Sequence, residues 1–177
     1  MGRRILVTGN AGSGKSTLVR EIAENLRIPC HGLDAIVWAP GWRKTPAEER
    51  DRRILELIQG EAWVVDGVSF LAQAAADTVI FLDVPRRVCF WRVAKRNWRY
   101  LFRSRPGLPA GCPEILIVPA LCRIIWNFPA RVRPRILERT ESGGGPKCIF
   151  QVKSRGDLDT FLTMMKTAGN KVRLLSS

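Results

Sequence analysis

One segment of the sequence has the residue types and spacing of a phosphate-binding loop. Residues 9–16 read Gly-Asn-Ala-Gly-Ser-Gly-Lys-Ser and fit the pattern G-x-x-x-x-G-K-[ST] without deviation. Glycines let such a loop fold tightly around phosphate oxygens with its N–H groups turned inward. The predicted nucleotide-binding residues are Gly9, Asn10, Ala11, Gly12, Ser13, Gly14, Lys15, Ser16 and Thr17.

Two side chains of this loop have distinct expected roles. Lys15 should reach the β- and γ-phosphates of ATP and act in catalysis, and the Ser16 hydroxyl should bind Mg²⁺. The helix that follows begins at the phosphates, so the positive end of its dipole adds to their attraction. The segment therefore predicts ATP and Mg²⁺ as cofactors.

A carboxylate at the end of a strand would complete the metal site. Asp66 follows the apolar residues 63–65, and Asp83 follows the apolar residues 79–82. Either aspartate could hold Mg²⁺ or its water, as the second acid of P-loop enzymes does. We favour Asp66, with Asp83 as the alternative, while an aspartate that merely ends its strand is the plainer interpretation.

Arg92 and Arg96 are the third candidate element. They lie four residues apart in a basic stretch that is predicted to be helical, so they share one helix face. Phosphoryl transfer requires positive charge around the moving group, and guanidinium groups suit this task. The simpler alternative is a solvated basic face.

The elements that must position these residues alternate along the chain. Apolar, β-branched runs predict strands at residues 5–8, 28–33, 62–65, 78–82 and 148–152. Helical spacing or capping signals predict helices at 16–26, 45–60, 86–100, 114–138 and 157–167, the fourth broken around Pro119, Pro129 and Pro134. Such alternation is typical of an α/β fold with an open parallel sheet and helices on both faces. Trp91, Trp98 and Trp126 are predicted to lie in the core.

Composition limits the remaining possibilities. A length of 177 residues with 46% hydrophobic residues suits a single domain spanning 1–177. No apolar run approaches about 18 residues and the N-terminus has no signal pattern, so we expect a cytoplasmic protein without a membrane partner.

The net charge of +13 is concentrated in one segment. Residues 86–139 contain thirteen basic residues and two acidic ones, which should meet the phosphates of nucleotides or of nucleic acid. The sequence leaves open whether the protein is a monomer or a homodimer.

These motifs together resemble a known branch of P-loop kinases. The loop at 9–16, Asp66-Gly67, and Asp83-Val84-Pro85 followed by Arg92 and Arg96 look like the adenylate-kinase-like branch. The segments Trp38-Ala39-Pro40-Gly41-Trp42, Gly111-Cys112-Pro113-Glu114 and Trp126-Asn127-Phe128-Pro129 resemble its DNA topology modulation protein group. The similarity covers about residues 3–163.

The resemblance implies a more detailed arrangement. It implies a P-loop NTPase three-layer sandwich with strand order 2-3-1-4-5, an acceptor-binding region at about 34–60 and a basic lid at about 97–130. It also places Arg92 and Arg96 at the base of the lid, and residues 153–155, including Arg155, near the adenine base. Adenylate kinases follow their Asp-Gly with Phe-Pro-Arg, where this chain has Val68-Ser69-Phe70, so the resemblance does not imply AMP as the acceptor.

The acceptor should bind near Asp34. This residue follows the second predicted strand, and ligands of such sheets bind at the carboxyl ends of the strands. Trp38 and Trp42 flank Pro40-Gly41 and could stack on a ring of the acceptor or pack on the core. The leading hypothesis is phosphoryl transfer from ATP to a small-molecule acceptor, namely a nucleoside, a nucleotide or another small hydroxyl compound. The alternatives are a nucleic-acid-associated ATPase and a nucleotide-binding regulator.

Overall fold

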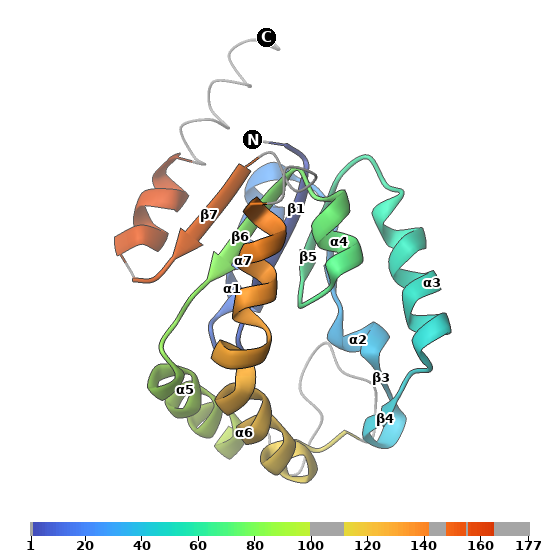
Figure 1. Ribbon diagram of the computed structural model, residues 1–177, viewed down its shortest axis with the longest axis vertical. Helices are drawn as coiled ribbons and strands as arrows, with labels where there is room; N and C mark the ends of the chain where they lie inside the picture. The colour runs from blue at the N-terminus through green and yellow to red at the C-terminus, as the bar shows by residue number, and fades with distance from the viewer. Residues whose placement is uncertain (1, 100–111, 142–147, 155, 165–177) are drawn as a thin grey trace, which may run out of the picture.

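A parallel β-sheet of five strands forms the centre of the molecule in the computed structural model (Figure 1). The structure describes residues 2–99, 112–141, 148–154 and 156–164. The sheet strands are β1 (Arg4–Gly9), β2 (Cys30–Gly32), β5 (Trp63–Asp66), β6 (Thr78–Leu82) and β7 (Cys148–Val152). Their order across the sheet is β2-β5-β1-β6-β7, which is 2-3-1-4-5 when the sheet strands are counted along the chain. The expected order is confirmed.

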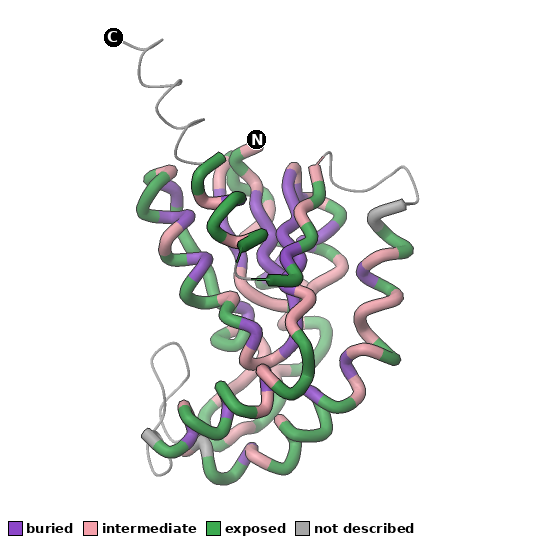
Figure 2. The backbone as a smooth tube through the Cα atoms, turned by 90° about the vertical axis from the view of Figure 1, so that its left-hand side faces the viewer, coloured by how far each residue is buried: buried purple, intermediate pink, exposed green. Residues whose placement is uncertain are grey.

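Helices cover both faces of this sheet. Side chains alternate between the two faces along each strand, and apolar side chains on both faces are buried by helices. Ile5 and Val7 face α1 (Lys15–Leu26) and the helical residues 156–164, whereas Leu6 faces α3 (Ala47–Ile58) and α4 (Phe70–Ala75). On the same side as α4, Phe81 packs against α6 (Glu114–Arg131) and α7 (Arg133–Glu141). Figure 2 shows that the buried residues gather in the strands and on the helix faces that cover them.

A short excursion follows β2 at the edge of the sheet. It consists of α2 (Asp34–Val37) and a small antiparallel hairpin of β3 (Trp38–Ala39) and β4 (Arg43–Lys44), joined by a 3₁₀ turn at Pro40–Trp42. Gly41 has a φ of 74° and Trp42 a φ of 58°, so the turn uses the left-handed region twice. The two aromatic side chains expected to flank this turn, Trp38 and Trp42, pack edge to face.

The helices after β6 differ from the prediction. α5 (Arg86–Arg99) agrees with it, but α6 continues through both Pro119 and Pro129. The chain bends at Val132, by 43°, where α7 begins with Pro134 in its first turn. Proline is tolerated there because the first N–H groups of a helix have no partner within it.

The expectation that Trp91, Trp98 and Trp126 lie in the core is wrong. Each of the three side chains is exposed, on the outer side of α5 or α6. Within the described residues, no single helix has the length and apolar character needed to cross a bilayer; only the bent pair α6–α7, taken together, passes by length and composition.

Candidate functional site

The phosphate-binding motif forms the turn between β1 and α1. Gly9, Gly12 and Gly14 have φ values of 149°, 78° and 106°, which favour glycine strongly. A Cβ on Gly12 would also lie 2.7 Å from the carbonyl oxygen of Cys89, because α5 packs directly against the loop. Gly14 is the N-cap of α1, and no acidic residue occupies the first turn of this helix. Its positive end is therefore available to an anion.

Two basic side chains, Lys15 of the loop and Arg92 of α5, each donate a hydrogen bond to a backbone carbonyl of the loop. Lys15 Nζ donates to the carbonyl of Asn10 at 2.9 Å, and Arg92 Nη1 donates to the carbonyl of Ser13 at 2.9 Å. Apart from the two neighbouring residues, the only described atom within 4 Å of a Cβ on Gly14 would be Arg92 Nη1, at 3.5 Å. The mouth of the loop is thus open and faces a guanidinium. Arg96 is half-buried one turn further along α5.

The candidate metal residues meet at the carboxyl ends of β1 and β5. Ser16 Oγ donates a hydrogen bond to Oδ2 of Asp66, the last residue of β5. Asp83 is engaged elsewhere: its carboxylate accepts from Arg133 Nε and Nη2, the latter at 2.8 Å, and from Gln151 Nε2 at 2.8 Å. Of the two aspartates, the structure brings Asp66 to the phosphate-binding loop and pairs Asp83 with α7.

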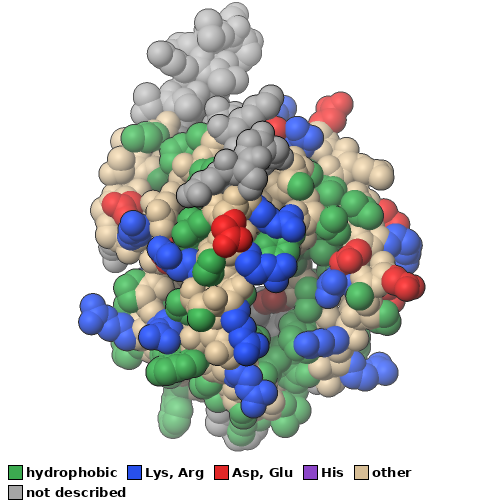
Figure 3. All heavy atoms as spheres, viewed as in Figure 1, with side chains coloured by type: hydrophobic (Ala, Val, Ile, Leu, Met, Phe, Trp, Pro, Cys, Tyr) green, Lys and Arg blue, Asp and Glu red, His purple; other side chains and the backbone are tan. Residues whose placement is uncertain are grey.

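Asp34 also lies at the carboxyl ends of the strands, just after β2. Gly32 of β2 is in register with Asp66, and the Leu33 N–H donates to the Asp66 carbonyl at 2.9 Å. Asp34 follows as the exposed first residue of α2. In Figure 3 the surface is hollowed between α6–α7 and the α2–β3 segment, and an acidic side chain lies inside the hollow.

The aromatic pair Trp38 and Trp42 belongs to the hairpin that follows α2. The rings of Trp38 and Trp42 have centroids 5.3 Å apart at an interplanar angle of 85°. Trp42 Nε1 donates to the carbonyl of Pro113 at 2.9 Å, and Cys112 Sγ lies 3.7 Å from the carbonyl oxygen of Ala39. The expected acceptor region therefore contacts the start of α6 directly. The remainder of the expected lid, residues 100–111, lies outside the described residues.

On the other side of the loop, a tight turn follows β7. The Asp157 carboxylate accepts hydrogen bonds from the N–H groups of Lys153 and Ser154, at 2.8 and 3.0 Å, and these bonds lower the pKa of Asp157. The Ser154 hydroxyl accepts in turn from the Asp157 N–H, which caps the last helix. Arg155, expected near the adenine base, lies outside the described residues.

Cys89 of α5 packs beside the loop, and its environment keeps its thiol neutral. Burial raises the pKa of its thiol, and the nearby charges of Lys15 and Arg92 offset this only in part. A thiol with a raised pKa is protonated at neutral pH and is a poor nucleophile. Covalent chemistry at Cys89 is therefore disfavoured, although the residue contacts the phosphate-binding loop.

Asn10 has a role that the motif alone does not reveal. Its side chain is buried, and its Nδ2 donates to the carbonyl of Ile125 in α6 at 3.0 Å while its Oδ1 accepts from the Ala11 N–H. In a regular helix the Ile125 carbonyl would accept from residue 129, but Pro129 has no N–H. Asn10 thus supplies the missing donor and joins the loop to α6. The sequence signal for this contact is a proline within a predicted helix, because the carbonyl four residues before it then needs a donor from another segment.

This arrangement predicts a thermodynamic coupling between Asn10 and Pro129. We expect Asn10→Ala to lower the free energy of unfolding by about 1–3 kcal/mol, because it leaves a buried carbonyl without a donor. In a Pro129→Ala background the helix regains its N–H, so the cost of Asn10→Ala should fall by about 1 kcal/mol. Urea unfolding of the four proteins in the cycle measures this difference. Asn25→Ala, which removes an exposed amide–carbonyl bond to Glu21, serves as the control. Equal costs in both backgrounds would contradict the link.

The Asp83–Arg133 pair predicts a pH-dependent contribution to stability. Burial raises the pKa of Asp83, but the hydrogen bonds from Arg133 and Gln151 outweigh it, and the net pKa lies below its ordinary value of 3.8. The pair therefore stabilises the fold above that ordinary pKa, and this contribution is lost as the pH falls through the pKa of the folded state.

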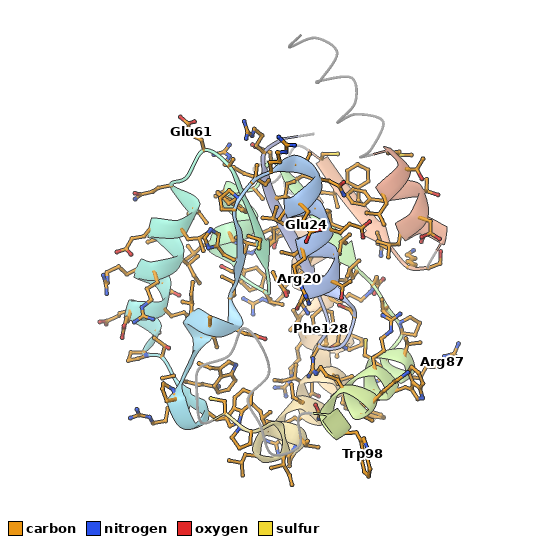
Figure 4. All side chains as sticks on the ribbon, turned by 180° about the vertical axis from the view of Figure 1, so that it is seen from behind. Arg20, Glu24, Glu61, Arg87, Trp98 and Phe128 are labelled. Atoms are coloured by element: carbon orange, nitrogen blue, oxygen red, sulfur yellow. The ribbon has the colours of Figure 1, made fainter. Side chains whose placement is uncertain are left out.

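We expect Asp83→Asn to be less stable than the parent by about 1–2 kcal/mol near neutral pH. The difference should shrink steadily below about pH 4, where the unfolded carboxylate becomes protonated. Urea unfolding across this pH range measures it. Glu61→Gln, which removes an exposed carboxylate (labelled in Figure 4), is the control. A constant difference at all pH values would show that the charge of Asp83 is not the cause.

Comparison with known proteins supports the fold. No family model and no curated protein sequence matches the chain. Among solved structures, a shikimate kinase from Bacteroides thetaiotaomicron is similar with a TM-score of 0.53 and 18% identity, over 95% of this chain and 98% of that one. A deoxyadenosine kinase from M. mycoides is similar with a TM-score of 0.53 and 16% identity, over 94% and 98%. A sugar kinase from Janibacter sp. HTCC2649 has a TM-score of 0.50 and 16% identity, over 92% and 94%. The chain therefore has the fold shared by these small-molecule kinases, a P-loop α/β sandwich.

Proposed function

We propose that the protein transfers the γ-phosphoryl group of ATP to a small-molecule acceptor. The observation that carries this proposal is the convergence of Lys15, the Ser16–Asp66 pair and Arg92 on one open phosphate-binding loop. In the reaction, an acceptor hydroxyl oxygen would bond to the γ-phosphorus, the bond from that phosphorus to the β–γ bridging oxygen would break so that ADP departs, and the hydroxyl proton would pass to solvent. The protein contributes mainly by positioning the groups and stabilising charge.

The residues present fit a magnesium ion of the kind that accompanies ATP. Mg²⁺ in such sites takes few protein ligands and completes its shell with water and phosphate oxygens. The Ser16 hydroxyl and the Asp66 carboxylate, already joined by a hydrogen bond, would hold it directly or through water. The ion would neutralise charge on the phosphates.

The remaining roles, which are phosphate binding, charge stabilisation and orientation of the acceptor, would fall to side chains of the protein. Lys15 would bind the β- and γ-phosphates, and Arg92 would face the transferred group, with Arg96 supporting the same charge field. Asp34 would orient the acceptor hydroxyl from the edge of the sheet. Arg155 would lie near the adenine base.

The acceptor side combines an acid with aromatic and basic surfaces. Asp34 and the Trp38–Trp42 pair suit a ring or a polyhydroxy compound. Positive charge on the phosphate-binding side, from Lys15 and Arg92, makes nucleotides and acidic hydroxyl compounds suitable acceptors as well as neutral ones.

The sequence resemblance adds an adenylate-kinase-like enzyme of the topology modulation group to the proposal. Length and composition add one kinase-like domain over residues 1–177, and the sequence pattern adds a cytoplasmic location. The similar kinases support the coarser statement only, since identities of 16–18% carry the fold and not the substrate.

Transfer of label from γ-labelled ATP tests the proposal. The full chain, Mg²⁺ and ATP are incubated with a panel of nucleosides, nucleotides, sugars and small hydroxy acids. Label on one acceptor, lost in Lys15→Ala, would establish kinase activity and name the substrate. If no acceptor is labelled and ATP turnover instead rises with added DNA or RNA, the kinase proposal fails in favour of a nucleic-acid-associated ATPase.

A further inference from the structure

The end of the molecule formed by α5 and α6 exposes large apolar side chains. On α5, Trp91 and Trp98 are 63% and 84% exposed, and on α6, Leu116 and Trp126 are 68% and 62% exposed. Trp91 and Trp98 are seven residues apart, so they share one side of α5, opposite the buried Cys89. Leu116 and Trp126 both lie on the exposed part of α6, roughly 80° apart around the helix, and neither shares the position of the buried Ile125. Figure 4 shows Trp98 pointing away from the molecule. We refer to Trp91, Lys95 and Trp98 of α5, with Leu116, Arg123 and Trp126 of α6, as the tryptophan face.

Positive charge accompanies these apolar side chains. α5 contains six basic residues and no acidic one, although Arg92 of these six donates to the phosphate-binding loop instead of lying on this surface. The Arg86 guanidinium lies 4.5 Å from the centre of the Trp126 ring, which joins the surfaces of the two helices, and Lys95 Nζ lies 5.2 Å from the centre of the Trp91 ring. In Figure 3 the surface over α5 and α6 shows hydrophobic and basic side chains together. The face therefore matches a partner that is both anionic and able to take up apolar groups.

Three kinds of partner can be compared on these terms. A second copy meeting the same face would bring like charges together, because a symmetric dimer uses the same patch twice. A nucleic acid would match the charge and could stack bases on the rings, but it would leave Leu116 without an apolar environment. A bilayer containing anionic lipids offers negative charge at its surface and an apolar layer just beneath it.

We propose that the tryptophan face docks the protein on an anionic membrane surface. Indole rings favour the interface between headgroups and hydrocarbon, and Lys and Arg are attracted to anionic headgroups. Leu116 would enter the upper acyl region. The sequence expectation of no membrane partner considered only a spanning segment; this contact is peripheral, and it does not depend on the proposed kinase activity.

Vesicle flotation with the full chain tests this inference. We expect binding to vesicles that contain phosphatidylserine, little binding to phosphatidylcholine alone, and weakening by salt. Trp98→Ser and Lys95→Glu should each lower the apparent affinity by about tenfold. Leu55→Ser, which alters an exposed apolar residue of α3, is the matched control and should bind like the parent. Thermal unfolding of each variant verifies that it folds.

Quenching of tryptophan fluorescence by brominated lipid gives a second readout. Quenching in the parent that decreases in Trp98→Ser would support insertion of this ring. Equal binding to neutral and anionic vesicles, or no binding to either, would overturn the inference. Binding of single-stranded DNA that depends on Trp98 without any vesicle binding would overturn it in favour of nucleic acid. Sedimentation as a dimer that Trp98→Ser dissociates would overturn it in favour of a second copy.

Discussion

Replacing Lys15 with alanine is expected to lower the rate of phosphoryl transfer by at least about a hundredfold. The Lys15 ammonium is held at the mouth of the loop by the Asn10 carbonyl, so it is already placed where phosphate charge would gather. No other lysine of the described residues belongs to the loop, so the lost charge has no nearby lysine to replace it. Initial rates with γ-labelled ATP and the acceptor found in the panel measure the effect.

Lys15→Ala should remain folded, because the side chain is only half-buried and the Asn10 carbonyl to which it donates belongs to the same loop. Circular dichroism and urea unfolding verify this. Lys15→Arg provides a comparison that keeps the charge but changes its shape, and we expect an intermediate rate. Retention of more than about a tenth of the parent rate by Lys15→Ala would show that Lys15 does not stabilise the transferred group.

The sequence predicts those parts of the fold and site that depend on local pattern. The loop at residues 9–16 is contiguous, so its turn and the helix after it follow from residue type alone. Ser16 and Asp66 are 50 residues apart, yet Ser16 begins the helix after the loop that follows β1, and Asp66 is the last residue of the adjacent parallel strand β5. A strand order that brings β5 beside β1 is then sufficient to join them.

The parts that were missed depend on contacts between distant segments. Asn10 meets α6 through Ile125, 115 residues later, and this contact lets the helix continue through Pro129, where a break was predicted. Asp83 is paired with Arg133, 50 residues away, and no local pattern distinguishes it from Asp66.

The exposed tryptophans were predicted wrongly for another reason. Size and hydrophobicity favour burial of indole rings, and that general preference was applied to Trp91 and Trp98. Lys95 lies between them at helical spacing, so all three share one side of α5. A lysine within the stripe was the local signal that this side of the helix faces outward.

Arg92→Ala is expected to lower kcat by about a hundredfold to a thousandfold. Arg92 reaches from α5 across the loop to the Ser13 carbonyl, and its guanidinium stands over Gly14 at the open mouth. A guanidinium in this place can bind the equatorial oxygens of a phosphoryl group as negative charge moves between donor and acceptor. Arg92→Lys should recover only part of the rate, since an ammonium lacks the planar fork. Arg3→Ala, just before the amino end of β1 and so at the other end of this strand from the loop, removes the same charge as a control.

The division of this effect between kcat and KM separates two roles for Arg92. If the guanidinium acts on the transferred group, Arg92→Ala lowers kcat while the KM for ATP and the free energy of unfolding change little. If Arg92 only braces the loop through the Ser13 carbonyl, the KM for ATP rises, kcat falls less, and the unfolding midpoint decreases. We expect the first pattern, because the backbone of the loop is also held by Lys15 and by the Asn10–Ile125 link, which remain in the variant. Observation of the second pattern would make Arg92 a positioning residue and leave Lys15 as the main charge on the phosphates.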